Sequence, residues 1–553
     1  QVRLQRPGPC SPPRAGDPPS AHGPRPMVCP LPALLALAAA LLSLAASDPS
    51  EANCAAGTGV GSEECLGDEK ALLQLELDTR RRVQALAAPG SPGVASYRQV
   101  LNNFGDVQYT GAVLIGNQTL SAVLDTGSFE ILAFSKNCLT CGKAGLKGYT
   151  SQGSSTYSAG RLVKTHVYGS GSALTYDGVE RISAGPYSVT KQDFWEAMDA
   201  SMPVLQTATF QVIFGLGPPG EPQIAARRML ATAQQVLNGT PAPMQRARAQ
   251  QDLQIANLVL SKRDSFLRNL NISYISACFD WAVGSPGYLI WNDTPPSQQP
   301  VTFTAIPVTS TIHWSLNITG SRFEGPMGVI DLGCHGGCEA VVDTGTSLIA
   351  VPTVIYNKAL NELSKLDGLC KNMHQMPNLV FSLGGTEYSL PPQSYIGVIT
   401  GGPPSDPQGW LHNTPPVRAC QLLLMDAGSG TSRLGPLWIL GMPFFRYYYT
   451  TFDLGSNPLD PSGRRVWTAP AAAGCVPAGQ AEHDVKLTYA RSQPLWSING
   501  SHVRVPRMRK RRTRTSSVEQ LGAAHGDEAS AEELGDVVAW RDRKRQRAAR
   551  LPL

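Results

Sequence analysis

Two aspartates, each at the end of an apolar run, have the clearest chemical potential in this chain of 553 residues. Asp125 follows residues 121–124 and begins Asp-Thr-Gly-Ser, and Asp343 follows residues 340–342 and begins Asp-Thr-Gly-Thr. A single Asp-Thr-Gly is typical of a turn after a strand. Two copies in the same context, 218 residues apart, indicate a two-lobed internal duplication.

A pair of carboxyl groups can hydrolyse an amide without a metal or a covalent intermediate. Two carboxyl groups held about 3 Å apart cannot both ionise, so they share a proton and titrate as a unit. The ionised member takes a proton from water as general base, and the protonated member donates to the scissile carbonyl as general acid. We therefore predict that Asp125 and Asp343 are a catalytic pair.

The residues that follow each aspartate fit a supporting role. Glycine in the third position permits a tight turn and a close backbone approach. The hydroxyl of Ser128 or Thr346 can hydrogen-bond the outer oxygen of its own aspartate. The predicted supporting residues are Thr126, Gly127, Ser128, Thr344, Gly345 and Thr346.

Further motifs, in the same order, resemble those of the pepsin-like aspartic proteases. Residues 108–116 resemble the first hairpin of that family, residues 167–171 its flap, and residues 210–217 the strand behind the first aspartate loop. Residues 376–381 and 438–453 resemble two segments of its second lobe. The resemblance extends over about two thirds of the chain.

This resemblance implies an all-β, bilobal fold, in which two β-barrel-like lobes flank an active-site cleft. The lobes would be residues 99–275 and residues 276–475. The implied activity is that of an aspartic endopeptidase with an acidic pH optimum and no cofactor. The substrate would be a protein or peptide in an extended conformation, covered by a flap that carries Tyr168, Gly169 and Ser170.

Two residues near Asp125 depart from the family pattern. Phe129 stands where the family has a second serine, and Leu132 stands where it has a tryptophan. That tryptophan normally gives the flap tyrosine a hydrogen-bond partner, so Tyr168 needs another partner or water. These departures support an alternative hypothesis, a non-catalytic protein that binds peptides or proteins and has kept the motifs.

An insertion at residues 221–270 interrupts the first lobe. Residues 225–237 and 244–258 have the pattern of helices, and Asn-Gly-Thr-Pro at 238–241 separates them. The insertion is interpreted as a surface helical hairpin, with a lid or a partner-binding element as the alternative.

The cysteines allow two interpretations. The resemblance implies the disulfides Cys138–Cys141, Cys334–Cys338 and Cys370–Cys420. The first two pairs could instead form a zinc site. A secretory route favours disulfides, so no metal is expected. Cys54 and Cys65 could close a loop of their own, and the partners of Cys278 and Cys475 stay open.

The chain ends fit a secretory precursor. Residues 27–47 resemble a signal peptide, because the 16 apolar or small residues 31–46 are too few for a stable membrane span. Residues 1–26 are predicted to be an unstructured extension, with translated upstream sequence as the alternative interpretation, and residues 48–98 a prosegment. We expect a monomer in the secretory pathway, either extracellular or in an acidic vacuole-like or lysosome-like compartment. Six glycosylation sequons agree with this route: Asn117, Asn238, Asn271, Asn292, Asn317 and Asn499.

The net charge of +5 lies at the chain ends. Residues 501–553 have a net charge of +6 and residues 1–26 one of +3, which leaves −4 for the rest. A mildly acidic body argues against nucleic acid as a partner. Residues 476–553 are predicted to be a disordered basic tail, because their composition cannot bury a core.

Overall fold

The computed structural model describes residues 95–262, 265–326, 328–363, 370–400, 420–432, 434–455, 461–480, 496–505 and 538–539. The predicted extension, the predicted signal peptide, Cys54, Cys65 and most of the predicted prosegment lie outside the described residues. Among the residues that the structure describes, strands predominate over helices, which confirms the predicted all-β class. No described helix has the length and apolar character needed to cross a membrane.

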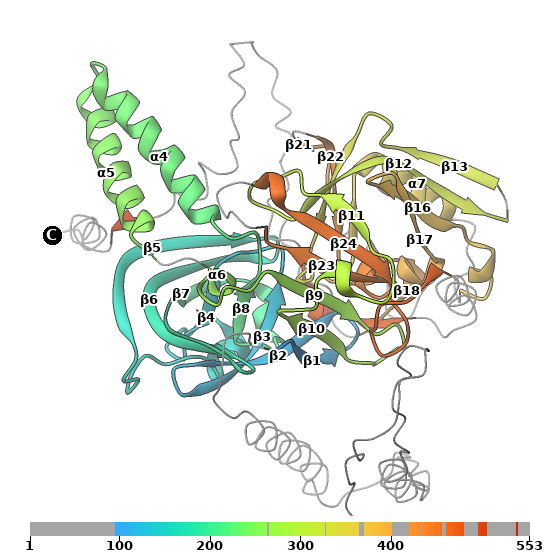
Figure 1. Cartoon of the computed structure of the whole chain (residues 1–553), viewed down its shortest axis with the longest axis horizontal. Helices are drawn as coiled ribbons and strands as arrows, with labels where there is room; N and C mark the ends of the chain where they lie inside the picture. Colours follow the sequence, from blue (N-terminus) through green and yellow to red (C-terminus); the bar gives the residue numbers. More distant parts are fainter. Residues whose placement is uncertain are drawn as a thin grey trace, which may run out of the picture. The chain divides into compact units, whose positions relative to one another are not determined.

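Fourteen strands from both ends of the described chain form one sheet (Figure 1). Its order is β11-β24-β23-β9-β10-β1-β2-β3-β8-β4-β7-β6-β5-β26, with an additional pairing of β2 to β6. The strands are β1 (Tyr97–Phe104), β2 (Gln108–Ile115), β3 (Gln118–Asp125), β4 (Ile131–Phe134), β5 (Ser158–Tyr168), β6 (Gly171–Ala184), β7 (Tyr187–Ser201), β8 (Val212–Gly215), β9 (Tyr274–Phe279), β10 (Gly287–Trp291), β11 (Thr304–Pro307), β23 (Tyr448–Asp453), β24 (Arg465–Pro470) and β26 (Val538–Ala539). Because β23 pairs with β9, the late strands extend the sheet that the early strands build.

Two further sheets use the second half of the chain. The larger contains β12 (Ser315–Gly325), β13 (Gly328–Gly333), β14 (Cys338–Val342), β15 (Ile349–Val351), β16 (Asn378–Leu383), β17 (Thr386–Leu390), β20 (Leu424–Asp426), β21 (Thr431–Ser432) and β22 (Gly435–Leu440). The smaller contains β18 (Ile396–Thr400), β19 (Cys420–Leu422) and β25 (Ser497–Asn499). Parallel pairs occur in corresponding places, β3 with β8 and β14 with β22, as expected for an internal duplication.

The helices are few. The α-helices are α3 (Gly142–Leu146), α4 (Glu221–Asn238), α5 (Pro243–Leu260), α6 (Phe266–Asn269), α7 (Thr353–Leu363) and α8 (Met442–Phe445). Short 3₁₀ helices span η1 (Pro203–Gln206), η2 (Pro296–Gln298), η3 (Met373–Gln375), η4 (Pro392–Ser394), η5 (Pro461–Gly463) and η6 (Gly500–His502). Helices α4 and α5 confirm the two predicted helices of the insertion and extend away from the β5–β6 edge (Figure 1). Their buried face contacts Leu162 and Trp195.

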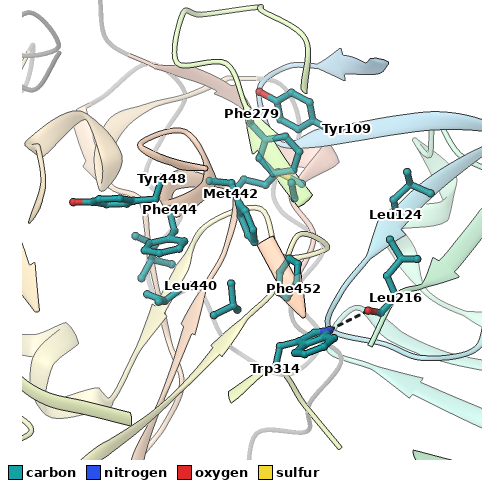
Figure 2. Close-up of a cluster of buried hydrophobic side chains, with 14 of the residues drawn as sticks. Tyr109, Leu124, Leu216, Phe279, Trp314, Leu440, Met442, Phe444, Tyr448 and Phe452 are labelled. Atoms are coloured by element: carbon teal, nitrogen blue, oxygen red, sulfur yellow. Dashed lines mark hydrogen bonds between the residues drawn. The ribbon is translucent and has the colours of Figure 1, made fainter. Parts of the chain in front are cut away.

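A buried tryptophan links the two halves of the chain. Trp314, just before β12, donates its indole N–H to the carbonyl oxygen of Leu216 at 3.0 Å (Figure 2). Its ring packs against Phe452 at a centroid distance of 5.2 Å. A buried indole N–H normally has a partner, and this one lies 98 residues away in the chain. The contact therefore holds the start of the second half against the segment that follows β8.

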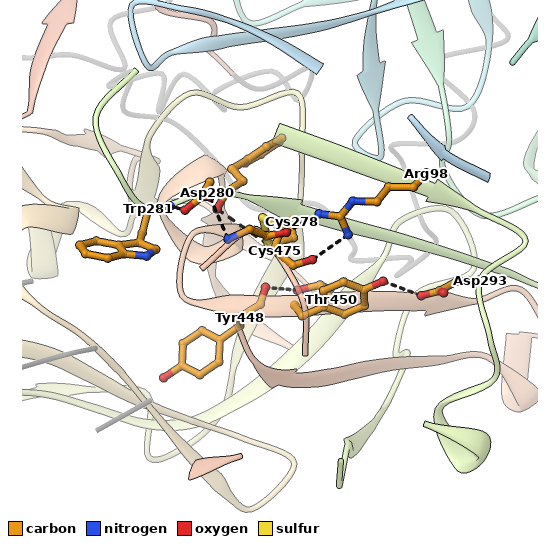
Figure 3. Close-up of a disulfide and its surroundings, with 11 residues drawn as sticks. Arg98, Cys278, Asp280, Trp281, Asp293, Tyr448, Thr450 and Cys475 are labelled. Carbon is orange, nitrogen blue, oxygen red and sulfur yellow. Dashed lines mark hydrogen bonds between the residues drawn. A yellow bond between two sulfur atoms is a disulfide. The ribbon is translucent and has the colours of Figure 1, made fainter. Parts of the chain in front are cut away.

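Four disulfides lie in the described residues. Three join the pairs that the resemblance implied: Cys138–Cys141, Cys334–Cys338 and Cys370–Cys420. The fourth joins Cys278 on β9 to Cys475, whose partners had stayed open (Figure 3). Arg98 on β1 donates to the carbonyl oxygen of Cys475 at 2.8 Å, which links β1 to this disulfide.

The structure corrects two boundaries. Strand β1 begins at Tyr97, so the end of the predicted prosegment belongs to the main sheet. Residues 496–505 are folded and largely buried, although we expected them in a disordered tail. Apolar side chains within the segment explain this, because Trp496, Ile498, Val503 and Val505 join a buried hydrophobic cluster. The prediction of a disordered tail rested on the composition of residues 476–553 as a whole, which the basic sequence after residue 505 dominates.

We predict that the fourth disulfide contributes more stability than the first. Its cysteines are 197 residues apart, against 3 for Cys138–Cys141. A cross-link that closes a longer loop restricts the unfolded chain more. The double variant Cys278→Ala/Cys475→Ala should lose about 4 kcal/mol of unfolding free energy, and Cys138→Ala/Cys141→Ala about 2 kcal/mol. Urea denaturation monitored by fluorescence measures both, and equal losses would contradict this account.

Candidate active site

Asp125 lies at the end of a buried strand. The side chains of Ala122, Val123 and Leu124 on β3 are almost completely buried, so the strand is held on both faces. In the parallel register of β3 and β8, Asp125 lies opposite Gly215. The carbonyl oxygen of Asp125 accepts from the backbone N–H of Leu216 at 2.8 Å. The end of the apolar run therefore determines where this carboxyl group lies.

Asp343 has the corresponding position in the second half. It directly follows β14, which runs parallel to β22. Its backbone N–H donates to the carbonyl oxygen of Leu440 at 3.0 Å. Both aspartate side chains are buried.

The two threonines after the aspartates bind each other's loops. The backbone N–H of Thr126 donates to the Thr344 hydroxyl at 3.0 Å, and the backbone N–H of Thr344 donates to the Thr126 hydroxyl at 2.9 Å. Each hydroxyl also donates across the boundary, Thr126 to the carbonyl oxygen of Val342 and Thr344 to that of Leu124. All four groups are buried, so each bond lost would leave unpaired polar groups away from water. The loops are therefore held as one unit.

The two glycines allow the carboxyl groups to approach. The backbone N–H of Gly127 donates to Asp125 Oδ1 at 3.0 Å, and that of Gly345 donates to Asp343 Oδ1 at 2.7 Å. A Cβ at Gly127 would lie 2.5 Å from Asp343 Cγ, and one at Gly345 would lie 2.2 Å from Asp125 Oδ1. Each glycine thus leaves the space that the opposite aspartate fills.

The two hydroxyls in the fourth position behave differently. Thr346 Oγ1 donates to Asp343 Oδ2 at 2.5 Å, as predicted. Ser128 Oγ is buried and has no hydrogen-bond partner within the described chain. The supporting bond is thus observed for Thr346, and that of Ser128 stays a prediction. The repeated motif did not reveal this difference, because the orientation of a serine hydroxyl depends on its tertiary surroundings.

The environment of Asp343 favours its protonated form. Burial raises the pKa of Asp343 to about 7, and the negative charge of Asp125 and a hydrogen bond between the two side chains act in the same direction. The Thr346 hydroxyl and the Gly345 N–H oppose the rise, because they donate to the ionised carboxylate. One member of the pair can therefore carry a proton in weakly acidic solution.

The predicted flap residues lie at the turn between β5 and β6. Tyr168 ends β5 and pairs with Gly171, so Gly169 and Ser170 form the turn. The Tyr168 side chain is buried in the same hydrophobic cluster as Leu132. The leucine at the usual tryptophan position is thus part of the packing around this tyrosine.

A charged group connects the first aspartate loop to the strand that leads to Tyr168. Glu130 accepts from Lys164 Nζ at 3.0 and 3.1 Å and from the indole of Trp195 at 3.1 Å. His166 Nδ1 lies 3.3 Å from the same carboxylate. The charge of Glu130 is thus paired with that of Lys164.

Residues 496–505 reach this site, which the sequence analysis missed. Arg504 Nη2 lies 3.5 Å from Asp125 Oδ2, and both side chains are almost fully buried. The backbone N–H of Arg504 also donates to the Ser347 hydroxyl, and the backbone N–H of Ser347 donates to the carbonyl oxygen of Arg504. An available signal was the alternation of apolar and polar residues at 496–499 and 503–505, which is typical of a strand.

The structure does not support the zinc alternative. Cys138, Cys141, Cys334 and Cys338 are joined in two disulfides, so their thiolates cannot bind a metal. Across the described ranges, His, Cys, Asp and Glu form no group of three or more suited to a metal ion.

Comparisons with known proteins agree with the geometry. The family model for eukaryotic aspartyl protease matches residues 108–244 and 282–460. Cathepsin E-A of Xenopus laevis is 29% identical over 368 residues, which cover 65% of this chain and 79% of the relative. Pepsin A of Bos taurus is 26% identical over 373 residues, which cover 65% of this chain and 85% of the relative. Cathepsin D of Clupea harengus is 28% identical over 371 residues, which cover 65% of this chain and 82% of the relative.

The raised pKa of Asp343 predicts how stability depends on pH. Between its ordinary value of 3.8 and about 7, the folded state holds a proton that the unfolded state has released. The free energy of unfolding should therefore fall as the pH rises through this interval. We expect Asp343→Asn to reduce this slope and the exposed control Asp199→Asn to keep it, both measured by urea denaturation from pH 4 to 7. An unchanged slope in Asp343→Asn would contradict the assignment.

Proposed function

The chain belongs to the eukaryotic aspartyl protease family, and we propose that Asp125 and Asp343 are the catalytic pair with which it cleaves peptide bonds. The observation that carries the proposal is the mutual holding of the two aspartate loops by Thr126 and Thr344. It gives two buried carboxyl groups a common site without a metal. The raised pKa of Asp343 supports a pair that shares one proton.

The chemistry follows from that shared proton. The ionised carboxyl accepts a proton from water as the water oxygen attacks the scissile carbonyl carbon, and the protonated carboxyl donates to the carbonyl oxygen. The resulting diol collapses when a carboxyl donates a proton to the leaving nitrogen and the other carboxylate accepts one from a diol hydroxyl. The C–N bond breaks, an acid and an amine form, and the pair again holds one proton.

We place the working range at acidic pH. Above about pH 7, Asp343 would lose its proton, and a doubly ionised pair has no general acid. Below the range in which either carboxyl ionises, the pair has no general base. A bell-shaped dependence with an acidic maximum follows from these two limits.

The substrate is proposed to be an extended protein or peptide segment. Tyr168, Gly169 and Ser170 stand at the tip of the β5–β6 hairpin and would close over it. An extended peptide can bind as an added strand, in which its backbone hydrogen bonds provide affinity. The proposed active form is a monomer.

The secretory route is proposed from the cysteine chemistry. Four disulfides in the described residues fit an oxidising compartment. The acidic working range favours an acidic compartment or the extracellular space. The non-catalytic alternative has no support, because Phe129 and Leu132 lie in buried packing while each aspartate still accepts the backbone N–H of the glycine two residues on.

We predict that Asp343→Asn lowers kcat/KM for peptide cleavage by about 10²–10⁴-fold, because it removes a proton donor and acceptor. Asp331→Asn is the matched control, since Asp331 is exposed on β13 and should leave kcat/KM unchanged. Cleavage of a peptide library from pH 3 to 7 provides the measurement. Full activity of Asp343→Asn would exclude the proposed mechanism.

A further inference from the structure

We propose that residues 496–505 are a peptide ligand of the catalytic cleft that the chain supplies itself, with Arg504 blocking Asp125 until the segment leaves. The inference rests on the proposed function and names a ligand class for the same site. That class is a basic peptide in which an arginine lies between aliphatic β-branched residues. Four sets of contacts carry the inference.

The first set is the backbone pairing at the second aspartate loop. The backbone N–H of Arg504 donates to Ser347 Oγ at 2.8 Å, and the Ser347 N–H donates to the carbonyl oxygen of Arg504 at 3.1 Å. Ser347 lies four residues after Asp343 and also donates its hydroxyl to the carbonyl oxygen of Val107. A peptide beside the catalytic pair could make the same two bonds with its own N–H and carbonyl groups, one to the Ser347 hydroxyl and one to the Ser347 backbone.

The second set comes from the first half of the chain. Gln108 Nε2 donates to the carbonyl oxygen of His502 at 2.7 Å, and Thr207 Oγ1 donates to that of Ser501 at 2.8 Å. The segment is thus bound from both halves at once, by side chains that approach its main chain. Recognition of main-chain carbonyls suits a site that binds peptides of varied sequence.

The third set anchors the ends of the segment. Strand β25 adds to β18 in parallel, with Ile399 opposite Ile498. The indole ring of Trp496 lies under the guanidinium of Arg446, 4.0 Å from its Cζ atom. Val503 and Val505 are buried in the same hydrophobic cluster as Trp496 and Ile498. Burial of four such side chains stabilises the bound segment through the hydrophobic effect.

The fourth set explains the block. The buried side chain of Arg504 lies beside the catalytic pair, with Nη2 3.5 Å from Asp125 Oδ2 and Cζ 5.3 Å from the ring centroid of Phe210. A guanidinium there occupies space that the attacking water and the scissile carbonyl need. Its Nη1 makes no hydrogen bond to any described residue, so its desolvation is only partly compensated. The ion pair therefore adds little net stability to the bound segment, so that a substrate can replace it.

The main test compares the full chain with Arg504→Ala. We expect kcat/KM for peptide cleavage to rise at least tenfold in Arg504→Ala, because the guanidinium no longer blocks the catalytic pair. Arg504→Lys keeps the positive charge and should rise less. Arg514→Ala removes another tail arginine and should match the unaltered chain. Circular dichroism verifies that each variant is folded.

A second measurement needs no variant. Pepstatin, an inhibitor of aspartic proteases, is added to the unaltered full chain, and hydrogen exchange of residues 496–505 is followed by mass spectrometry. If the segment occupies the cleft as proposed, bound inhibitor displaces it and its exchange rises. Inhibitor that binds Arg504→Ala but not the unaltered chain supports the same conclusion.

The outcomes separate the two proposals. Cleavage that is lost in Asp343→Asn but equal in the unaltered chain and folded Arg504→Ala overturns the ligand proposal and leaves the catalytic one standing. Bound pepstatin with unchanged exchange of residues 496–505 has the same meaning. Absence of both cleavage and inhibitor binding in folded Arg504→Ala overturns the catalytic proposal, and the ligand proposal with it.

Discussion

The constraint on which the rest depends is the reciprocal hydrogen bonding of Thr126 and Thr344. Two carboxyl groups from distant parts of the chain repel each other when ionised and lose hydration when buried. Other interactions must therefore hold the two aspartate loops together. The two hydroxyls provide it, because each accepts an N–H from the opposite loop and donates to the opposite strand. With all partners buried, an opening of this contact would expose several unpaired groups at once.

The sheets deliver those loops to the same point. Strands β3 and β14 each end at a motif, and each has a parallel neighbour that supports its last residues. The pairing of β23 with β9 and the indole of Trp314 join the halves beneath the loops. Packing of the buried side chains thus fixes the path of the backbone, and the backbone fixes the positions of the two carboxyl groups.

Much of this could be predicted from the sequence, because it depends on local patterns. The apolar runs before Asp125 and Asp343 and the two insertion helices have short-range signals, and three cysteine pairs were implied by the family resemblance. Ser128 could not be distinguished from Thr346, since the difference lies in tertiary contacts. Residues 496–505 escaped because their binding surface comes from residues as distant as Gln108. The pairing of Cys278 with Cys475 is similarly long-range.

The covalent position of the cleft segment has a further consequence. A ligand on the same chain as its site has an effective concentration that the linker sets and that dilution of the protein does not change. Residues 481–495 are that linker between Gln480 and Trp496. After cleavage of any peptide bond in the linker, residues 496–505 would be a separate molecule. Their binding to the cleft would then depend on the protein concentration. The ligand would then be lost as the protein is diluted, because no disulfide of the described residues retains it.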